Sequence, residues 1–206
     1  MSTRQRLSAE ARREVIARAA SEVFAERGYH AASIDEIALR SGVSPPVVYD
    51  HFESKQELYK RLLERHQEEL LALWTEQLAG DEPLDQRIPR ALEAWFDYIE
   101  ENPAWLLVFR DAPTELADLH RELRARSLGS LMPMMGRETD PEEVTISADQ
   151  AALAITTELF RSAVAGVAIW WYEHRDVPRE QVIALIMSVL WLGFERVQQG
   201  ETWRPE

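Results

Sequence analysis

The sequence predicts an all-α protein of about nine helices, and three observations support this prediction. Apolar residues recur at helical spacing through most of the 206 residues. No segment alternates apolar and polar residues between hairpin turns, and the dipeptides Asn-Gly and Asp-Gly are absent. Serine followed three residues later by glutamate, a helix-start signal, occurs directly before apolar runs. With 46% hydrophobic and 29% charged residues, the composition is typical of a folded globular chain rather than a disordered one.

The first predicted helix carries an apolar stripe and ends at Gly28, which can adopt left-handed backbone angles. Ser33 and Glu36 then form a capping box that begins a short helix ending at Arg40. After a tight turn at 41–43, residues 44–46 (Ser-Pro-Pro) begin another short helix, which ends near His51.

A second capping box, Ser54 to Glu57, begins a long helix that continues to about Leu78 without proline or glycine. Further helices are expected at about 85–100, 104–111, 114–131, 147–174 and 178–199, with an acidic loop at 136–145. The chain therefore divides into an N-terminal domain, 1–53, with a helix-turn-helix at 33–52, and a C-terminal domain, 54–206.

Charge is distributed unevenly between these two parts. The chain has a net charge of −13, yet residues 1–60 contain as many basic as acidic side chains, so the excess of acid lies in residues 61–206. Arginines are concentrated in the first twenty residues. A neutral head with a basic tip on an acidic body suits a protein that contacts a polyanion at one end.

Several classes of protein are excluded. The absence of cysteine rules out disulfide scaffolds, thiolate metal sites and cysteine nucleophiles. The residues preceding Val15 lack the apolar stretch of a secretory signal, and the longest uncharged runs, 162–172 and 181–194, are too short to span a membrane. No catalytic or phosphate-binding motif is present. We therefore expect a cytoplasmic protein with no metal, no cofactor and no enzymatic activity.

The helix-turn-helix segment resembles the signature of tetracycline-repressor-like (TetR) regulators. The resemblance rests on Ser44, Val48-Tyr49, His51-Phe52, Lys55 and Glu57-Leu58, and it extends back through Phe24–Gly28 and Ile34–Ala38 to cover about residues 10–66. It implies a dimeric transcriptional regulator, expected to be a repressor. The three-helix head of such a protein reads the major groove of operator DNA, and its body binds a small molecule that releases the DNA.

The resemblance also assigns roles to individual residues. The phosphate contacts are expected from Ser33, Tyr49, His51 and Lys55, and the residues facing the groove are Ser44, Pro45, Pro46, Val47 and Asp50. Val48 and Phe52 are expected to point into the core. The segment 45–51 contains no Arg, Lys, Gln or Asn, so base contacts should depend on apolar contact with thymine methyl groups. Further basic contacts are expected from an N-terminal arm that contains Arg4, Arg6, Arg12 and Arg13.

The body contains candidate residues for binding a small, largely apolar or aromatic ligand. These are Trp95, Trp105, Phe109, Arg110, Glu158 and Arg161. Two alternatives stay open: the aromatic residues can be ordinary core residues, and Glu158 and Arg161 can simply pair with each other. The last two helices, about 147–174 and 178–199, are rich in uncharged residues and predict a homodimer interface.

Two functional interpretations follow from these features. The first is a ligand-responsive regulator in which the helix at 54–78 transmits a ligand-induced shift near Leu70 to Trp74 toward the head. The alternative is an all-α carrier of apolar molecules with a vestigial helix-turn-helix. Charge placement favours the regulator, because a carrier has no need of a neutral, arginine-tipped head.

Overall fold

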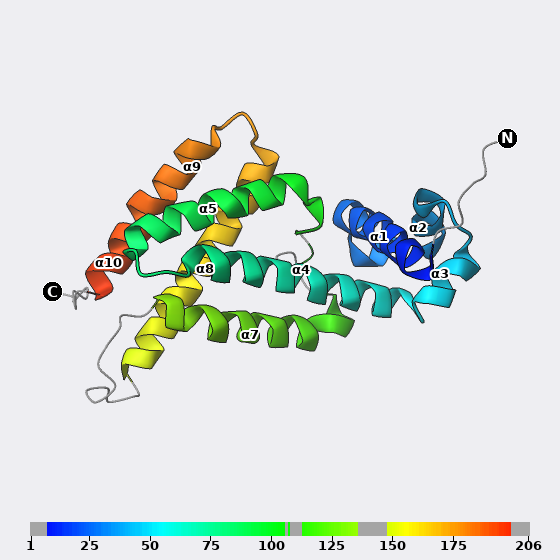
Figure 1. Cartoon of the computed structure of the whole chain (residues 1–206), viewed down its shortest axis with the longest axis horizontal. Helices are drawn as coiled ribbons and strands as arrows, with labels where there is room; N and C mark the ends of the chain where they lie inside the picture. Colours follow the sequence, from blue (N-terminus) through cyan, green and yellow to red (C-terminus); the bar gives the residue numbers. More distant parts are fainter. Residues whose placement is uncertain (1–7, 106, 108–112, 136–147, 199–206) are drawn as a thin grey trace. The chain divides into compact units, whose positions relative to one another are not determined.

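A computed structural model describes residues 8–105, 107, 113–135 and 148–198, and every regular element within these ranges is helical (Figure 1). The prediction of an all-α fold is therefore confirmed. The chain forms two compact units. The first comprises Met1–Glu68 and Glu101–Leu123, and the second comprises Glu69–Glu100 and Arg124–Glu206. The first unit thus extends beyond residue 53, the end of the DNA-binding domain expected from the sequence.

The first unit begins with α1 (Ala9–Ala31), α2 (Ile34–Ser41), α3 (Pro45–His51) and the start of α4 (Lys55–Leu78). Both predicted capping serines accept the expected hydrogen bond: Ser33 Oγ from the Glu36 N–H at 3.1 Å, and Ser54 Oγ from the Glu57 N–H at 3.0 Å. Gly28 has φ 74°, so the regular helix breaks there, and one further turn follows before α1 ends. The local signals in the sequence therefore placed these helices correctly.

The core of the first unit includes residues that are distant in sequence from its first four helices. After α5 (Leu84–Glu101) come two short 3₁₀ turns, η1 (Pro103–Trp105) and η2 (Thr114–Leu116), and then α7 (Ala117–Met135). Apolar side chains of these elements, together with Leu107, pack with those of α1–α4 in one core. Its buried members are Ile16, Ala17, Ala20, Val23, Phe24, Ala32, Ile37, Ala38, Val48, Phe52, Leu58, Tyr59, Leu62, Leu63, Ala104, Leu107, Leu116 and Leu123. Ala104, Leu107, Leu116 and Leu123 are therefore part of the core of the first unit.

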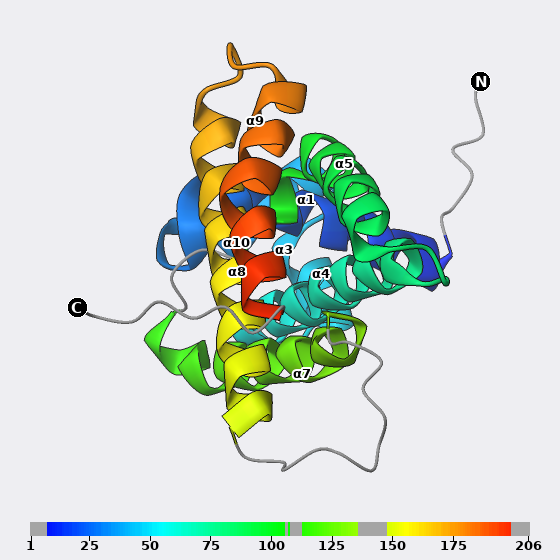
Figure 2. The same cartoon turned by 90° about the vertical axis from the view of Figure 1, so that its left-hand side faces the viewer.

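The second unit contains the end of α4, α5, most of α7, and the C-terminal helices. These are α8 (Ala148–Glu173), α9 (Arg179–Ile186), the π-helical turn η3 (Met187–Trp191) and α10 (Leu192–Gln198). In Figure 2 the α9–α10 segment overlaps α8 in projection, and α9 contacts α8. One predicted boundary was wrong, because α7 continues through Pro133 rather than ending near residue 131. The helix expected at 178–199 is helical from Arg179 to Gln198, and it contains the π-helical turn η3.

Aromatic side chains form the centre of the second unit. The Trp74 and Trp95 rings lie 6.0 Å apart, Trp95 and Phe96 lie 5.5 Å apart, and Phe96 meets Trp171 edge to face at 4.9 Å. The Trp171 indole N–H donates to the Val177 carbonyl at 2.9 Å, which ties α8 to the turn before α9. Trp95 is fully buried, as expected of a core residue.

One described helical segment, Leu153–Glu173 in α8, is long and apolar enough to cross a membrane, with a mean hydropathy of 1.3. Only 28% of this segment is buried within the chain. Length and composition alone are weak grounds for assigning a membrane span, because core and interface helices share them. The segment does show that α8 carries more apolar surface than this chain covers.

Candidate nucleic-acid interface

The turn between α2 and α3 is set by Gly42. Gly42 ends α2 with φ 69°. The Gly42 N–H donates to the Leu39 carbonyl at 3.2 Å, and the Val43 N–H donates to the Ala38 carbonyl at 3.0 Å. A Cβ atom at this position would touch no other atom, so the requirement for glycine comes from the backbone angle and not from crowding. This turn fixes the direction in which α3 leaves α2.

Helix α3 is held by a single buried side chain of its own, Val48, and by Phe52 directly after it. Pro46, Tyr49 and Asp50 are exposed on the other side of the helix, and Tyr49 retains 52% of its accessible surface. The prediction that Val48 and Phe52 point inward is therefore confirmed. The short helix presents one uninterrupted outward face, as an element that enters a DNA groove must.

The two prolines change the chemistry at the start of α3. Pro45 and Pro46 have no N–H, and the Val47 N–H bonds to the Ser44 carbonyl at 2.9 Å. No N–H is left for the Ser44 side chain to cap, and Ser44 Oγ makes no capping hydrogen bond. Unlike Ser33 and Ser54, Ser44 thus exposes a hydroxyl group that is not engaged in capping its own helix.

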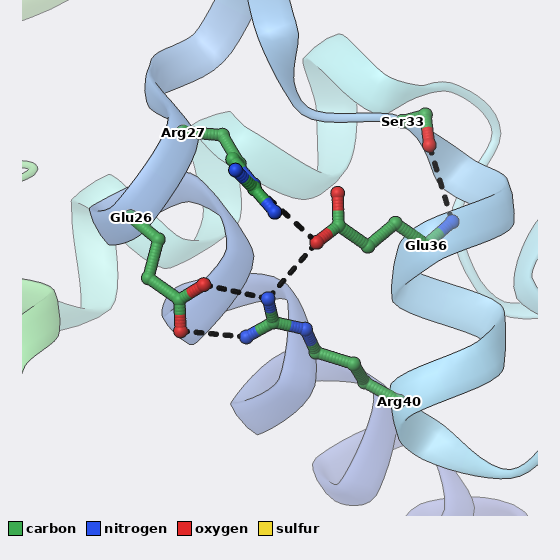
Figure 3. Close-up of polar contacts among 5 residues, drawn as sticks. All are labelled: Glu26, Arg27, Ser33, Glu36 and Arg40. Atoms are coloured by element: carbon green, nitrogen blue, oxygen red, sulfur yellow. Dashed lines mark hydrogen bonds and ion pairs between the residues drawn. The ribbon is translucent and has the colours of Figure 1, made fainter.

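Arg40 and Arg27, two cations close to the helix-turn-helix, form ion pairs within the protein (Figure 3). Arg40 donates to both carboxylate oxygens of Glu26 at 2.7 and 2.6 Å, and to Glu36 at 2.9 Å. Arg27 lies 3.5 Å from the same Glu36 oxygen. The hydrogen bond from Arg40 lowers the pKa of Glu26, and the bond to Glu26 raises the pKa of Arg40. This network fastens the end of α1 to α2.

The same network leaves the first capping box half formed. Ser33 accepts from the Glu36 N–H, but the Glu36 carboxylate faces Arg40 and Arg27 and makes no bond to the Ser33 backbone N–H. Among the described residues, neither the Ser33 hydroxyl proton nor its backbone N–H has an acceptor, and both lie at the N-terminus of α2, where the helix dipole favours an anion. This geometry is consistent with the expected phosphate role of Ser33.

Of the predicted N-terminal arm, Arg4 and Arg6 lie outside the described residues. Arg13 is exposed, and its guanidinium lies 5.0 Å from the centre of the Phe52 ring, directly after α3. Arg12 is half-buried, and neither Arg12 nor Arg13 forms an ion pair with another described residue. The structure thus brings one arm arginine next to the end of the recognition helix.

Lys55 is placed differently from the expectation. Its ammonium group donates to the carbonyl oxygens of Tyr29 at 2.8 Å, Ala32 at 3.0 Å and His30 at 3.4 Å. It also lies 4.6 Å from the centre of the Tyr29 ring. An ammonium group has three protons, so these carbonyls use its whole donor capacity. No sequence signal indicated this long-range contact.

The residues of the predicted ligand pocket are distributed along the chain. Trp95 belongs to the second compact unit and Trp105 to the first, and Phe109 and Arg110 lie outside the described residues. Glu158 and Arg161 do meet: the carboxylate accepts from Arg161 Nε at 2.8 Å and Nη2 at 2.7 Å. Arg124 of α7, which sequence reasoning missed, donates to the same carboxylate. Among the described residues no cluster of three potential metal ligands occurs.

Comparison with known proteins identifies the family. Residues 16–62 match the family described as bacterial regulatory proteins, tetR family. The transcriptional activator FasR of Mycolicibacterium smegmatis is 31% identical over 196 residues, covering 93% of this chain and 87% of FasR. The transcriptional repressor KstR2 of Mycobacterium tuberculosis H37Rv is 29% identical over 110 residues, covering 53% of this chain and 55% of KstR2.

Solved structures share the fold along almost the whole chain. A TetR-like regulator from Rhodococcus sp. RHA1 superposes with a TM-score of 0.72 at 20% identity, covering 95% of this chain and all of that one. FadR from Bacillus subtilis, solved in complex with stearoyl-CoA, superposes with a TM-score of 0.68 at 19% identity, covering 92% of this chain and 99% of FadR. The helix-turn-helix geometry and the full-length relative agree. The chain belongs to the TetR family of DNA-binding transcriptional regulators.

Proposed function

We propose that this chain binds operator DNA as a homodimer and changes its DNA affinity when a largely apolar ligand with an anionic group enters its second unit. The observation that carries the DNA-binding part is α3, which is anchored by Val48 and exposes its opposite face. In a dimer the two α3 helices would lie about 34–36 Å apart, one DNA turn, to enter successive major grooves.

The residue roles expected from the sequence remain part of this proposal, with one revision. Ser33, Tyr49 and His51 bind phosphates, and Ser44, Pro45, Pro46, Val47 and Asp50 face the base edges. Lys55 is left out of this set because its ammonium group donates to carbonyl oxygens of the protein. The named relatives include both kinds of regulator: FasR is a transcriptional activator and KstR2 is a transcriptional repressor. We keep repression as the prediction for this chain, and a reporter gene behind its operator tests it. A cytoplasmic location follows from this role.

Dimerisation is supported by apolar side chains that the chain leaves exposed on its C-terminal helices. On α8 these are Ile155, Leu159 and Trp170, and on α9, η3 and α10 they are Leu185, Val189 and Leu192. Within each set the spacing places the side chains on one helix face. Ser162 and Gly166 are exposed between Leu159 and Trp170, which allows another helix to approach α8 closely.

A second copy of this chain is a better occupant of this surface than a lipid bilayer. The apolar segment of α8 contains Glu158 and Arg161 near its middle, and charged groups are costly in hydrocarbon. The exposed surface instead combines apolar and small residues, which is typical of paired helices. Two copies related by a two-fold axis would cover α8 and α10 of each other in a four-helix arrangement.

Sedimentation equilibrium at micromolar concentration tests the dimer. Leu159→Arg should shift the mass from two chains to one, because it places a charge in the interface. Leu39→Arg is the matched control, since Leu39 is an exposed leucine on α2 in the first unit. A wild-type protein that sediments as a monomer would contradict the proposal, and so would equal dissociation of the two variants.

The ligand part of the proposal is supported by an uneven charge cluster in the second unit. Glu158 accepts from Arg124, from Arg161 and from the Ser162 hydroxyl at 2.9 Å, so two guanidinium groups share one carboxylate. The Arg161 side chain is only 19% exposed, and burial lowers the pKa of both arginines. One positive charge is left over in a partly desolvated site, where an anionic ligand group would be favoured.

A buried hydroxyl group one helical turn before Arg161 also supports a ligand site in this region. Thr157 is 3% exposed, and its Oγ1 atom has no hydrogen-bond partner among the described residues. Leaving a buried hydroxyl unpaired costs about 1–3 kcal/mol, which a polar ligand atom would recover. Stearoyl-CoA, the ligand present in the FadR structure, combines a long apolar chain with phosphate groups. We propose a ligand of this acyl thioester class.

Two measurements test the function. The DNA directly upstream of the chain's own gene should bind in a gel shift, with affinity that falls steeply as salt rises. Addition of stearoyl-CoA should change that affinity by about 5–150-fold, the usual range of allosteric coupling. Arg161→Met should abolish the response to stearoyl-CoA while DNA binding without ligand stays at the wild-type level. Retention of the response in Arg161→Met would refute the anionic site.

Transmission of the ligand signal is proposed to use α4. This helix is continuous from Lys55 to Leu78, with residues 55–68 in the first unit and 69–78 in the second. A shift of residues 69–78 would therefore be transmitted along the same helix to residues 55–68 in the first unit. Structures with and without stearoyl-CoA test this, because an unchanged separation of the two α3 helices in the dimer would exclude the mechanism.

A further inference from the structure

We propose that Lys55 is a positioning residue that holds the junction between α1 and α2 in its DNA-binding conformation, and that it is not a phosphate ligand. The proposal rests on the proposed DNA-binding function, and it replaces the role that the sequence pattern suggests for this residue. Three observations carry it: the convergence of carbonyl groups on the ammonium, the aromatic contact with Tyr29, and the link from Ala32 to Ser33.

The carbonyl groups converge because α1 ends irregularly. The backbone turns at Gly28, and the carbonyls of Tyr29, His30 and Ala32 no longer point along a regular helix. Helix C-termini carry partial negative charge from such carbonyls, and a lysine ammonium neutralises it. Lys55 stands at the first turn of its own helix, α4, where a cation is unfavourable, so the end of α1 is its favourable electrostatic partner.

The Tyr29 ring strengthens the placement. The Lys55 ammonium lies 4.6 Å from its centre, within the range of a cation–π contact. Tyr29 in turn packs edge to face on Tyr59 at 5.1 Å and stacks on Phe24 at 6.1 Å, both of which are buried. Burial raises the pKa of Tyr29, with a further contribution from Glu115, so the ring stays neutral. The ammonium thus sits in a site built by the core.

Lys55 affects DNA binding through the peptide bond between Ala32 and Ser33. Lys55 holds the Ala32 carbonyl, and the next peptide N–H along the chain is that of Ser33, the N-cap of α2. Ser33 has both its N–H and its hydroxyl proton available for a phosphate. By fixing the Ala32–Ser33 peptide plane, Lys55 aims these donors. Its own charge is used inside the protein and does not displace counterions from DNA.

The salt dependence of binding separates this role from a direct contact. The probe is a duplex that the wild-type protein selects from a random-sequence pool. Lys55→Met should weaken binding about tenfold at every salt concentration, through misplaced Ser33 donors, and leave the slope of log affinity against log salt unchanged. Lys60→Met is the matched control, because Lys60 is exposed and pairs only with Glu64. A slope reduced by about one per protomer would overturn the proposal.

A double-mutant cycle with Ser33→Ala tests whether Lys55 acts through Ser33. Ser33→Ala removes the hydroxyl group but keeps the backbone N–H, so Lys55→Met should have a smaller effect in this background than in the wild type. Full additivity would show two independent contacts and overturn the proposal. Unchanged affinity of a less stable Lys55→Met variant would show a purely structural role and overturn it as well.

The wild-type protein supplies a test that needs no variant. Lys55 and Lys60 are its only lysines, so amine acetylation read by mass spectrometry has an internal reference. In the DNA-free protein Lys55 should react roughly tenfold more slowly than Lys60, since its hydrogen bonds must open first, and added duplex should not slow it further. Equal reactivity of the two lysines, or protection of Lys55 by DNA, would refute the assignment. If no duplex is selected, the proposed function fails, while the labelling of the DNA-free protein still decides where Lys55 sits.

Discussion

The attachment of α3 depends on very few side chains, and a substitution at Val48 measures how much one of them contributes. A helix of seven residues is not stable in water by itself, so its order comes from packing. Val48 is the only buried residue within α3 and is 0% exposed. Val48→Ala removes two methyl groups, which costs about 1.6 kcal/mol in transfer free energy at about 0.8 kcal/mol for each group. The cavity left behind raises the total to about 2 kcal/mol.

Hydrogen exchange reports this loss locally. Because the chain folds as two compact units, a single unfolding free energy for the whole molecule would mix their contributions. Exchange of the α3 amides, including the Phe52 N–H that bonds to the Val48 carbonyl at 3.0 Å, should accelerate about 30-fold in Val48→Ala. Amides of α8 in the second unit should keep their wild-type rates.

Val47→Ala is the matched control for this prediction. Val47 neighbours Val48 on α3 but is only half-buried, so the same truncation should alter exchange of α3 very little. Its effect is instead expected on sequence preference, if Val47 contacts thymine methyl groups. Wild-type exchange of α3 in Val48→Ala would refute the single-anchor reasoning, as would an equal acceleration in Val47→Ala.

Three further predictions concern the turn, an ion pair and a histidine of the first unit. Gly42→Ala should destabilise that unit by about 1–2 kcal/mol, because Gly42 has φ 69° and a Cβ atom there would meet no other atom. Gly42→Asn should cost less, because asparagine adopts left-handed backbone angles more readily than alanine. Equal effects of the two substitutions in thermal melts would contradict this. The bond from Arg40 lowers the pKa of Glu26, so the stability from this pair is present above the unfolded-state value of 4.5 and is lost as pH falls through the folded-state value. Arg40→Gln should return the Glu26 carboxyl titration, followed by NMR, toward 4.5, and an unshifted titration would dismiss the pairing. Burial lowers the pKa of His120 below its ordinary value of 6.5. As pH falls, the imidazole is therefore protonated in the unfolded state at a higher pH than in the folded state. The free energy of unfolding decreases as pH drops below 6.5. His120→Phe should flatten urea-denaturation stability across that range while keeping a ring beside Tyr59, and an unaltered pH profile would exclude His120 as the cause.

Local sequence signals predicted the helix-turn-helix well because the interactions behind them span only a few residues. Ser33 and Ser54 cap helices three residues away, and Gly42 supplies a backbone angle that other residues avoid. The outward face of α3 also follows from its own pattern, since Val48 and Phe52 are the apolar positions that pack inward. The family resemblance includes Val48 and Phe52, and the segment that it covers, about residues 10–66, also contains Ser33, Gly42 and Ser54. The fold and the DNA-binding role could therefore be predicted from the same segment.

The partners of long charged side chains were decided only by tertiary structure. Lys55 reaches carbonyls 23 to 26 positions earlier in the chain, and Arg40 of α2 pairs with Glu26 of α1. A flexible side chain can satisfy its charge in many ways, and the choice depends on which helix ends the fold brings near it. The sequence pattern placed Lys55 in the first turn of its helix, but it gave no indication of the carbonyl groups that the ammonium contacts.

The extent of the head was likewise determined by packing between distant segments. Ala104, Leu107, Leu116 and Leu123 join the core of α1–α4, although the expected boundary lay at residue 53. Periodicity shows that a side chain is apolar and on which face of its helix it lies, but not which of several apolar surfaces covers it. By itself the sequence determined the helices, their caps and the DNA-reading motif through short-range backbone chemistry. Only the tertiary structure decided the pairing of charges and the limits of the core, because these depend on contacts between residues far apart in the chain.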